Sequence, residues 1–224
     1  IYVYDFNTNM MRRVNVLPPD LRDAMADYAD IKLTISDGLA CIAVCRTRQL
    51  NAYRDQTADE LLAAIKRCDA DPSIRAVMLT GEGRAFGAGY DLSTISPDDV
   101  PALDDVLENH FNPVIRAMRA SRLPFVAAVN GPCAKVSADR ASEWGLIWKV
   151  VDDAQLEAEC RSICDILVSR DPDAVASTKR LIEASHHLNL DEQLDMERDL
   201  QGELGRAPAM KAQIAAFFAR KKAK

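Results

Sequence analysis

The stretch LTGEGRAFGAGYDL, Leu79–Leu92, suits neither a regular strand nor a regular helix. It overlaps the end of the apolar run IRAVMLT, residues 74–80, which is typical of a short buried strand. Two glycines, Gly87 and Gly89, then alternate with other residues just before an acidic one. Because glycine has no side chain, its backbone can turn sharply or approach a ligand closely. The stretch therefore predicts a strand that ends in a loop with something packed close to its main chain.

Strand and helix patterns flank this stretch. Residues 31–44 read as a β-hairpin, because IKLTI alternates, SDG can turn and LACIAV is apolar. Thr57 and Glu60 form a possible capping box ahead of a helix with an apolar face. A second helix is predicted over 106–118, followed by a buried strand in PFVAAVN, 124–130. Repeated strand, helix and strand units of this kind predict a parallel sheet in an α/β fold.

Beyond this region the pattern becomes helical. Gly145 is expected to end the first of these helices as a C-cap. The predicted helices cover residues 138–144, 154–169, 173–187, 190–204 and 208–221. We divide the chain into an N-terminal extension (1–30), an α/β core (31–136) and a helical region (137–224). An apolar stripe over 21–28 in the extension fits one face of a helix.

Composition excludes several classes of function. The 224 residues are 48% apolar, which is enough for a sizeable core, and the formal charge is -6. Basic residues are dispersed apart from the terminal ARKKAK, which disfavours nucleic-acid binding. No apolar run approaches the roughly 20 residues that cross a bilayer, so we expect a cytoplasmic protein without a membrane partner. The six cysteines lack a histidine at ligand spacing and are expected to be thiols, with no metal.

Five blocks of sequence resemble the enoyl-CoA hydratase/isomerase family, the crotonases. They are CRTRQLNAY (45–53), LTGEGRAFGAGYDL (79–92), PFVAAVNGPCA (124–134), SADRASEWGLIWKVVDD (137–153) and AAFFARKKAK (215–224). The blocks occur in family order, and together they are far more specific than a pair of glycines. FNPVIRAM, EWGLIWKVVDD and LDEQLDMERD look most like the branch that isomerises ring-type acyl-CoAs in phenylacetate degradation. The resemblance implies an α/β fold with a crotonase-like ββα spiral core and a C-terminal helical trimerisation region.

The resemblance also implies a chemistry for the opening stretch. Crotonases bind an acyl-CoA thioester and pass through an enolate, whose oxygen is held by preorganised backbone N–H groups. By position in the motif, one such donor is the backbone N–H of Tyr90. The resemblance implies an acyl-CoA as the partner, with coenzyme A arriving as part of the substrate and no separate cofactor.

The coenzyme A cradle is carried over in the same way. The residues implied to line it, mainly through their backbone, are Gln49, Leu50, Ala52, Ala88, Asp91 and Leu92. The family pattern Asn-Arg-Pro is replaced here by Cys45, Arg46 and Thr47, so the entry to this loop can differ in shape. Arg220 and Lys221 match a basic ending that approaches coenzyme A phosphates in relatives, and a solvated basic tail is an equal alternative.

One part of the family pattern is missing. After Ala134 the family continues with a second oxyanion donor, further strands and the acid/base carboxylates, so about fifty to sixty residues are absent. The general base is therefore unknown. Either a segment is missing from the sequence or the chain is truly shortened. We favour the first, because a strand ending at Asn130 would otherwise pass within a few residues to a helix capped by Ser137.

The remaining candidates for a base have simpler interpretations. Glu82 is interpreted as a turn residue, Asp91 as a loop anchor and His110 as a packed side chain on an apolar helical face. Two functions stay open. The first is an acyl-CoA hydratase/isomerase, and the alternative is a non-catalytic acyl-CoA-binding or assembly protein with a crotonase fold. On family grounds we expect a homotrimer or homohexamer, although the apolar helical faces can equally pack within one monomer.

Overall fold

The computed structural model describes residues 2–5, 10–13, 28–95, 101–131, 133, 136–208, 210 and 212. The chain divides into two compact units, Ile1–Leu167 and Val168–Lys224, which we describe separately. The division lies within helix α5. None of the helices in the described part of the chain is long and apolar enough to cross a membrane.

A four-stranded sheet forms the centre of the first unit. Strands β3 (Ile31–Ser36) and β4 (Leu39–Val44) form the predicted hairpin, and Asp37 and Gly38 both adopt positive φ at its turn, at 50° and 80°. Strand β5 (Ala76–Gly81) lies parallel to β4, and β6 (Phe125–Ala128) lies parallel to β5. The strand order is β3-β4-β5-β6, and the parallel pairing of β4, β5 and β6 confirms the predicted parallel arrangement.

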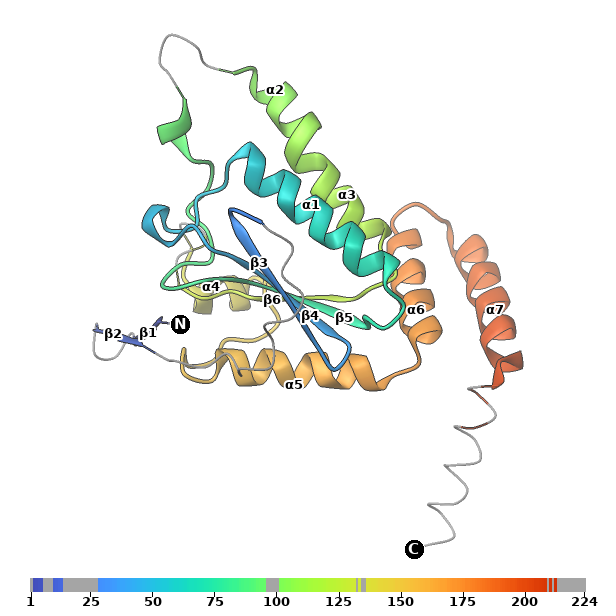
Figure 1. Cartoon of the computed structure of the whole chain (residues 1–224). Helices are drawn as coiled ribbons and strands as arrows, with labels where there is room; N and C mark the ends of the chain where they lie inside the picture. Colours follow the sequence, from blue (N-terminus) through green and yellow to red (C-terminus); the bar gives the residue numbers. More distant parts are fainter. Residues whose placement is uncertain are drawn as a thin grey trace, which may run out of the picture. The chain divides into compact units, whose positions relative to one another are not determined.

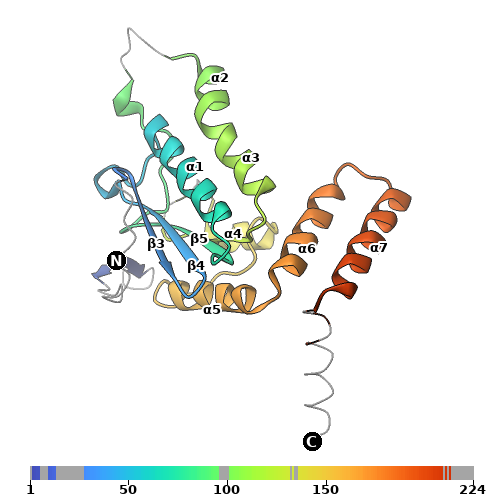
Figure 2. The ribbon, with the colours of Figure 1, turned by 45° about the vertical axis from the view of Figure 1, so that its right-hand side comes forward.

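Helices cover both faces of this sheet (Figures 1 and 2). On one face α1 (Asp55–Ala70) packs beside α3 (Asn112–Ala120), and α1 buries Ile65 and Cys68 against the sheet. On the other face lies α5 (Leu156–Ser169), whose inward side chains include Cys160 and Cys164. The apolar stripes predicted for these helices therefore form the core of the first unit.

The start of α1 differs from the sequence prediction. Arg54 is the N-cap, and Thr57 stands at the third helical position, where its Oγ1 accepts the backbone N–H of Arg54 at 3.2 Å. Glu60 does not close a capping box with Thr57. Its carboxylate accepts the backbone N–H groups of Ala29 and Asp30, at 3.0 and 2.8 Å. The expected box is wrong because both side chains bind the segment that precedes β3.

The connection from β5 to β6 contains an irregular helix. Helix α2 (Leu103–Val106) runs into a π-helical turn, Leu107–Phe111, and then into α3. After α3, the Arg122 guanidinium donates to the carbonyl oxygens of Asp69, Asp71 and Ile74, at 3.1, 2.6 and 3.0 Å. Arg122 therefore joins the end of α1 to the approach to β5, as cations near a helix C-terminus commonly do.

The sequence runs without a break from β6 into the next helix. Helix α4 (Ala138–Glu143) begins after Ser137, whose hydroxyl accepts the N–H of Arg140 at 3.3 Å. Gly145 has a φ of 70° directly after α4, which confirms the predicted glycine cap. The junction itself, Ala134 and Lys135, lies outside the described residues. The expectation that a segment is missing between these two residues therefore stays a prediction.

Two further helices form most of the second unit. Helix α6 (Pro172–Ala184) begins at Asp171, which accepts the N–H of Ala174 at 3.0 Å, and α7 (Leu190–Arg206) begins with a capping box between Asn189 and Glu192. These bounds confirm the helices predicted around 173–187 and 190–204, although α6 ends three residues earlier and α7 two residues later than predicted. The predicted helix at 208–221 lies mostly outside the described residues.

The N-terminal extension holds one short hairpin. Strands β1 (Tyr2–Asp5) and β2 (Met10–Arg13) pair in antiparallel fashion, which the sequence reading did not predict. The helical stripe expected over 21–28 lies outside the described residues except for Tyr28, which packs against the core.

Candidate active site

The loop after β5 begins on a scaffold supplied by β6. The side-chain amide of Asn130 donates to the carbonyl oxygens of Gly81 and Gly83, at 2.7 and 3.0 Å. Its oxygen accepts the N–H of Gly81 at 3.1 Å. Thr80 adds a hydrogen bond from its hydroxyl to the carbonyl of Ala128 at 3.0 Å. The end of β5, the last residue of β6 and Asn130 just after it thus fix where the glycine-rich loop starts.

Asn51, in the loop that follows β4, supports the glycine-rich loop from inside, a role that the sequence analysis missed. It is fully buried, has a φ of 56°, and donates from Nδ2 to the carbonyls of Glu82 and Ala85 at 2.9 and 2.6 Å. A Cβ on Gly81 would lie 2.7 Å from that Nδ2 atom, so no larger residue fits at Gly81. The one available signal was an asparagine in a loop, since asparagine tolerates the left-handed conformation.

Tyr90 lies in a short parallel bridge with Tyr53. The N–H of Tyr53 donates to the carbonyl of Gly89, and the N–H of Asp91 donates to the carbonyl of Tyr53, each at 2.8 Å. In extended chain, successive N–H groups point to opposite sides. The N–H of Tyr90 therefore points away from Tyr53, toward the other side of the loop.

Gly87 and Gly89, the two glycines of the opening stretch, are required for different reasons, the first for space and the second for backbone conformation. A Cβ on Gly87 would lie 2.5 Å from Cε2 of the Tyr53 ring, so the loop passes that ring only without a side chain. Gly89 has a φ of 92°, and a Cβ there would meet no heavy atom within 4 Å. The backbone beside Tyr90 is thus both strained for other residues and open to an approaching group.

The predicted coenzyme A cradle is brought together by the same bridge, because it sets the loop 49–53 beside 88–92. Gln49 ends a 3₁₀ turn and Leu50 follows in the left-handed conformation with a φ of 52°. Ala52 is buried, whereas Ala88 is exposed and Leu92 is 73% exposed. Arg220 and Lys221 lie outside the described residues.

Asp91 has a structural role, as one interpretation of the sequence predicted. Its carboxylate accepts the backbone N–H and the hydroxyl of Ser93, at 3.0 and 2.6 Å, and caps a 3₁₀ turn at Leu92–Thr94. It also accepts from Arg46 Nη2 at 2.6 Å. The hydrogen bonds from Ser93 and Arg46 lower the pKa of Asp91, so it remains a carboxylate. Its side chain therefore anchors the loop.

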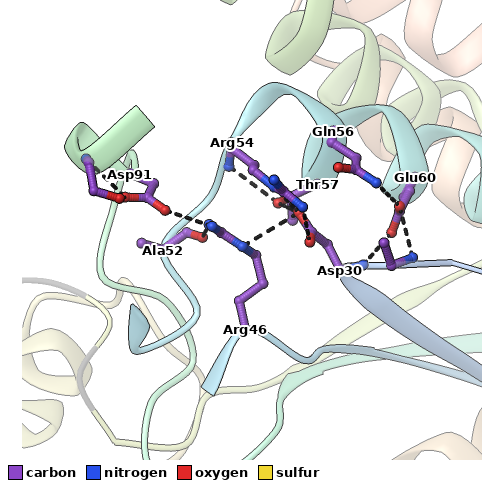
Figure 3. A network of polar contacts seen from close by, with 10 residues as sticks. Asp30, Arg46, Ala52, Arg54, Gln56, Thr57, Glu60 and Asp91 are labelled. Carbon is purple, nitrogen blue, oxygen red and sulfur yellow. Dashed lines mark hydrogen bonds and ion pairs between the residues drawn. The ribbon is translucent and has the colours of Figure 1, made fainter. Parts of the chain in front are cut away.

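A buried ionic network holds the two loops together (Figure 3). Arg46, 10% exposed, lies between Asp91 and Asp30 and also donates to the carbonyl of Ala52. Asp30, 4% exposed, accepts from the Arg54 guanidinium at 2.7 and 2.8 Å and from the Thr57 hydroxyl at 2.6 Å. Burial alone would raise the pKa of Asp30, but these hydrogen bonds and the positive charges outweigh it, so the pKa is lowered.

The other candidate bases are also engaged. Glu82 pairs with Lys32 at 2.9 Å, and although burial raises the pKa of Glu82, hydrogen bonds from Cys45 and Lys32 lower it more. Burial, then the neighbouring Glu82, raises the pKa of Cys45 to about 12, so this residue stays a thiol. His110 is not packed among apolar side chains as expected, because its Nδ1 lies 2.8 Å from Asp59 Oδ1.

Comparisons with known proteins agree with this architecture. The sequence profile described as enoyl-CoA hydratase/isomerase matches residues 34–135 and 132–224. The chain is 26% identical to 1,2-epoxyphenylacetyl-CoA isomerase of Escherichia coli, over 84% of this chain and 94% of that protein. It is 28% identical to a protein of Rhodobacter capsulatus named probable enoyl-CoA hydratase, over 85% and 95%. The chain belongs to the enoyl-CoA hydratase/isomerase family, and these two relatives are named as an isomerase and a probable hydratase.

The fold is shared with solved structures of that family. An enoyl-CoA hydratase from Bacillus anthracis superposes with a TM-score of 0.78 at 18% identity, covering 86% of this chain and 97% of that one. The first unit and the helical C-terminal part thus adopt the crotonase fold that the sequence predicted.

The comparisons also show how many positions of the relatives have no counterpart in this chain. The Escherichia coli alignment runs over 247 positions, and 84% of this 224-residue chain, about 188 residues, fills them, which leaves about 59 positions without a counterpart. The two profile matches meet at residues 132–135, between β6 and α4. This is the point at which the family pattern breaks off in the sequence.

We predict that Gly87→Ala destabilises the first unit by about 1–3 kcal/mol, because the new methyl group overlaps the Tyr53 ring. Urea unfolding followed by circular dichroism measures this. A second substitution, Tyr53→Leu, should recover part of the loss, since it removes the ring. Strict additivity of the two changes would contradict the overlap.

We predict a pH-dependent effect for Asp30→Asn. Because the folded-state pKa of Asp30 lies below its ordinary value of 3.8, its ionised form stabilises the fold above that pH. This stabilisation is lost as the pH falls through the folded-state pKa. The variant should therefore be less stable than the parent by about 3 kcal/mol at pH 7, with a smaller difference near pH 3.

Unfolding free energies at the two pH values test this expectation. Asp105→Asn, a change of an exposed carboxylate on α2, is the matched control and should alter stability by less than about 0.5 kcal/mol. An equal deficit for Asp30→Asn at both pH values would contradict the assignment.

Proposed function

We propose that this protein is an acyl-CoA hydratase/isomerase that stabilises a thioester enolate, with the backbone N–H of Tyr90 as one oxyanion donor. The observation that carries the proposal is the Tyr53–Tyr90 bridge, which directs that N–H away from Tyr53 beside the open backbone of Gly89. A donor fixed before the substrate arrives needs no reorganisation when charge develops on the thioester oxygen. Family membership supports the acyl-CoA substrate.

We propose that coenzyme A lies along the two bridged loops. The loop residues are Gln49, Leu50, Ala52, Ala88, Asp91 and Leu92, contributing mainly through their backbone. Arg220 and Lys221 are proposed to approach the phosphates. Coenzyme A is then part of the substrate, and the proposal requires no separate cofactor.

A second candidate function is binding of an acyl-CoA without turnover. It is favoured by the roughly 59 positions that the relatives have and this chain lacks. In the family pattern these positions carry the second donor and the acid/base carboxylates. Among the described residues, the carboxylates nearest to Tyr90 in sequence, Asp91 and Glu82, are held by Arg46 and Lys32. The hydratase/isomerase proposal therefore requires a base supplied by another residue or another subunit.

Turnover assays separate the two functions. The hydratase/isomerase proposal expects hydration of crotonyl-CoA, or double-bond or ring isomerisation of an acyl-CoA. Tight binding of butyryl-CoA by calorimetry, with no turnover of any of these substrates, would instead establish the binding function.

For the donor itself, we predict that Tyr90→Pro lowers kcat about 10²- to 10³-fold by removing the N–H. Proline at this position keeps both bridge hydrogen bonds, since these use the N–H groups of Tyr53 and Asp91. Circular dichroism and the affinity for coenzyme A alone are the controls for folding. Unchanged kcat in a folded variant would remove Tyr90 from the mechanism.

We further propose a cytoplasmic homotrimer or homohexamer. A reducing compartment suits six cysteines that are all thiols. Large apolar side chains are exposed beyond α4, with Trp144 at 57% and Trp148 at 78%, and on α6 and α7 at Ile182 and Leu190. Such surfaces commonly mark contacts between subunits. Light scattering after size exclusion should give three or six times 24.7 kDa, and a monomer mass would refute this assembly.

A further inference from the structure

The side chain of Tyr90 is held by groups outside the glycine-rich loop. Its hydroxyl donates to Asp55 Oδ1 at 3.0 Å, and Asp55 is the first residue of α1. Its ring meets the ring of Phe111 edge to face, with centroids 5.9 Å apart and an interplanar angle of 63°. Phe111 is the last residue of the π-helical turn. The side chain of Tyr90, whose N–H is the proposed donor, therefore contacts two segments that are distant in sequence, the start of α1 and the π-helical turn.

Asp55 is in turn contacted by His110, the residue before Phe111. Nε2 of His110 lies 3.7 Å from Asp55 Oδ2, and its Nδ1 lies 2.8 Å from Asp59 Oδ1. Asp55 and Asp59 stand four residues apart and share one face of α1. The imidazole therefore spans both carboxylates and restricts where the Asp55 carboxylate can lie.

The π-helical turn makes this arrangement possible. In a π turn the hydrogen bond spans one residue more than in an α-helix, which changes the direction of the side chains that follow, and such turns are frequent at functional sites. Here it presents two consecutive side chains to the same region, His110 to the carboxylates of α1 and Phe111 to Tyr90.

A fixed side chain fixes the backbone that carries it. The two hydrogen bonds of Tyr53 hold Gly89 and Asp91, the residues on either side of Tyr90. The motion that they leave to Tyr90 is a rotation of its peptide group about the direction of the chain. The hydrogen bond from the Tyr90 hydroxyl to the Asp55 carboxyl group opposes that rotation. A donor contributes to catalysis only when it is aimed at the oxyanion to within a few tenths of an ångström.

We propose that Asp55, braced by His110, is a positioning residue that holds Tyr90 so that its backbone N–H is aimed at the thioester oxygen. This inference rests on the proposed function of Tyr90. It adds a requirement for two side chains, one from α1 and one from the π-helical turn, that touch no substrate.

The test measures polarisation of the thioester carbonyl directly. Butyryl-CoA labelled with ¹³C at the carbonyl carbon is bound to the full chain, and the ¹³C resonance moves downfield in proportion to hydrogen bonding at the oxygen. Tyr90→Phe and Asp55→Ala should each return the resonance toward that of unbound butyryl-CoA, with the affinity for coenzyme A alone unchanged.

Two matched variants separate positioning from charge. Asp55→Asn keeps an oxygen that accepts from the Tyr90 hydroxyl and should restore most of the downfield shift that Asp55→Ala loses. Asp59→Asn removes the same charge one turn along α1 without touching Tyr90 and should leave the shift nearly as in the parent. Equal shifts in the parent, Tyr90→Phe and Asp55→Ala would overturn the inference while leaving the proposed function standing.

A measurement on the unliganded protein completes the test. With ¹⁵N-tyrosine labelling the chain has five labelled amides, and the Tyr90 resonance is the one absent in Tyr90→Phe. Asp55→Ala should move this resonance, whereas Asp59→Asn should not. An unchanged Tyr90 amide resonance in Asp55→Ala would overturn the inference. Absence of any carbonyl shift in the parent protein would overturn the proposed function, and the inference with it.

Discussion

The two main-chain hydrogen bonds that Tyr53 makes with Gly89 and Asp91 join loops that leave neighbouring strands of the sheet. One loop follows β4 and the other follows β5, and without this bridge nothing in the sheet itself would keep them together. The bridge sets the spacing between the proposed coenzyme A cradle and the proposed oxyanion donor. It also explains why Gly87 has no side chain, because the Tyr53 ring occupies that space.

Polar groups carry the rest of the site architecture. Arg46, which pairs with Asp91 and Asp30, and Asp30 itself have little exposure to water, and Asn51 supports the glycine-rich loop from inside. Buried charges of this kind are costly to desolvate and are tolerated only when each is matched by a partner. The loops are therefore defined by a few specific contacts, which is what a site made of backbone donors requires.

The sequence predicted the regular elements well, because their signals are local. The alternation in residues 31–36 and the SDG turn predict the hairpin, and Gly145 marks the end of α4. Contacts between distant segments were not predictable in the same way. Thr57 and Glu60 have the spacing of a capping box, but their side chains bind residues 29 and 30, and no local pattern distinguishes the two outcomes. The roles of Asn51 and His110 were missed for the same reason.

The exposed segment beyond α4 has a practical consequence for spectroscopy. Trp144 and Trp148 are the only two tryptophans of the chain, and both side chains lie largely in solvent. Intrinsic tryptophan emission will therefore report on this one surface, and it should shift to shorter wavelength when another molecule covers it. Tryptophan emission will respond little to changes in the sheet or in the ionic network, because neither contains a tryptophan. A denaturation curve followed by fluorescence would record the fate of this surface rather than that of the core.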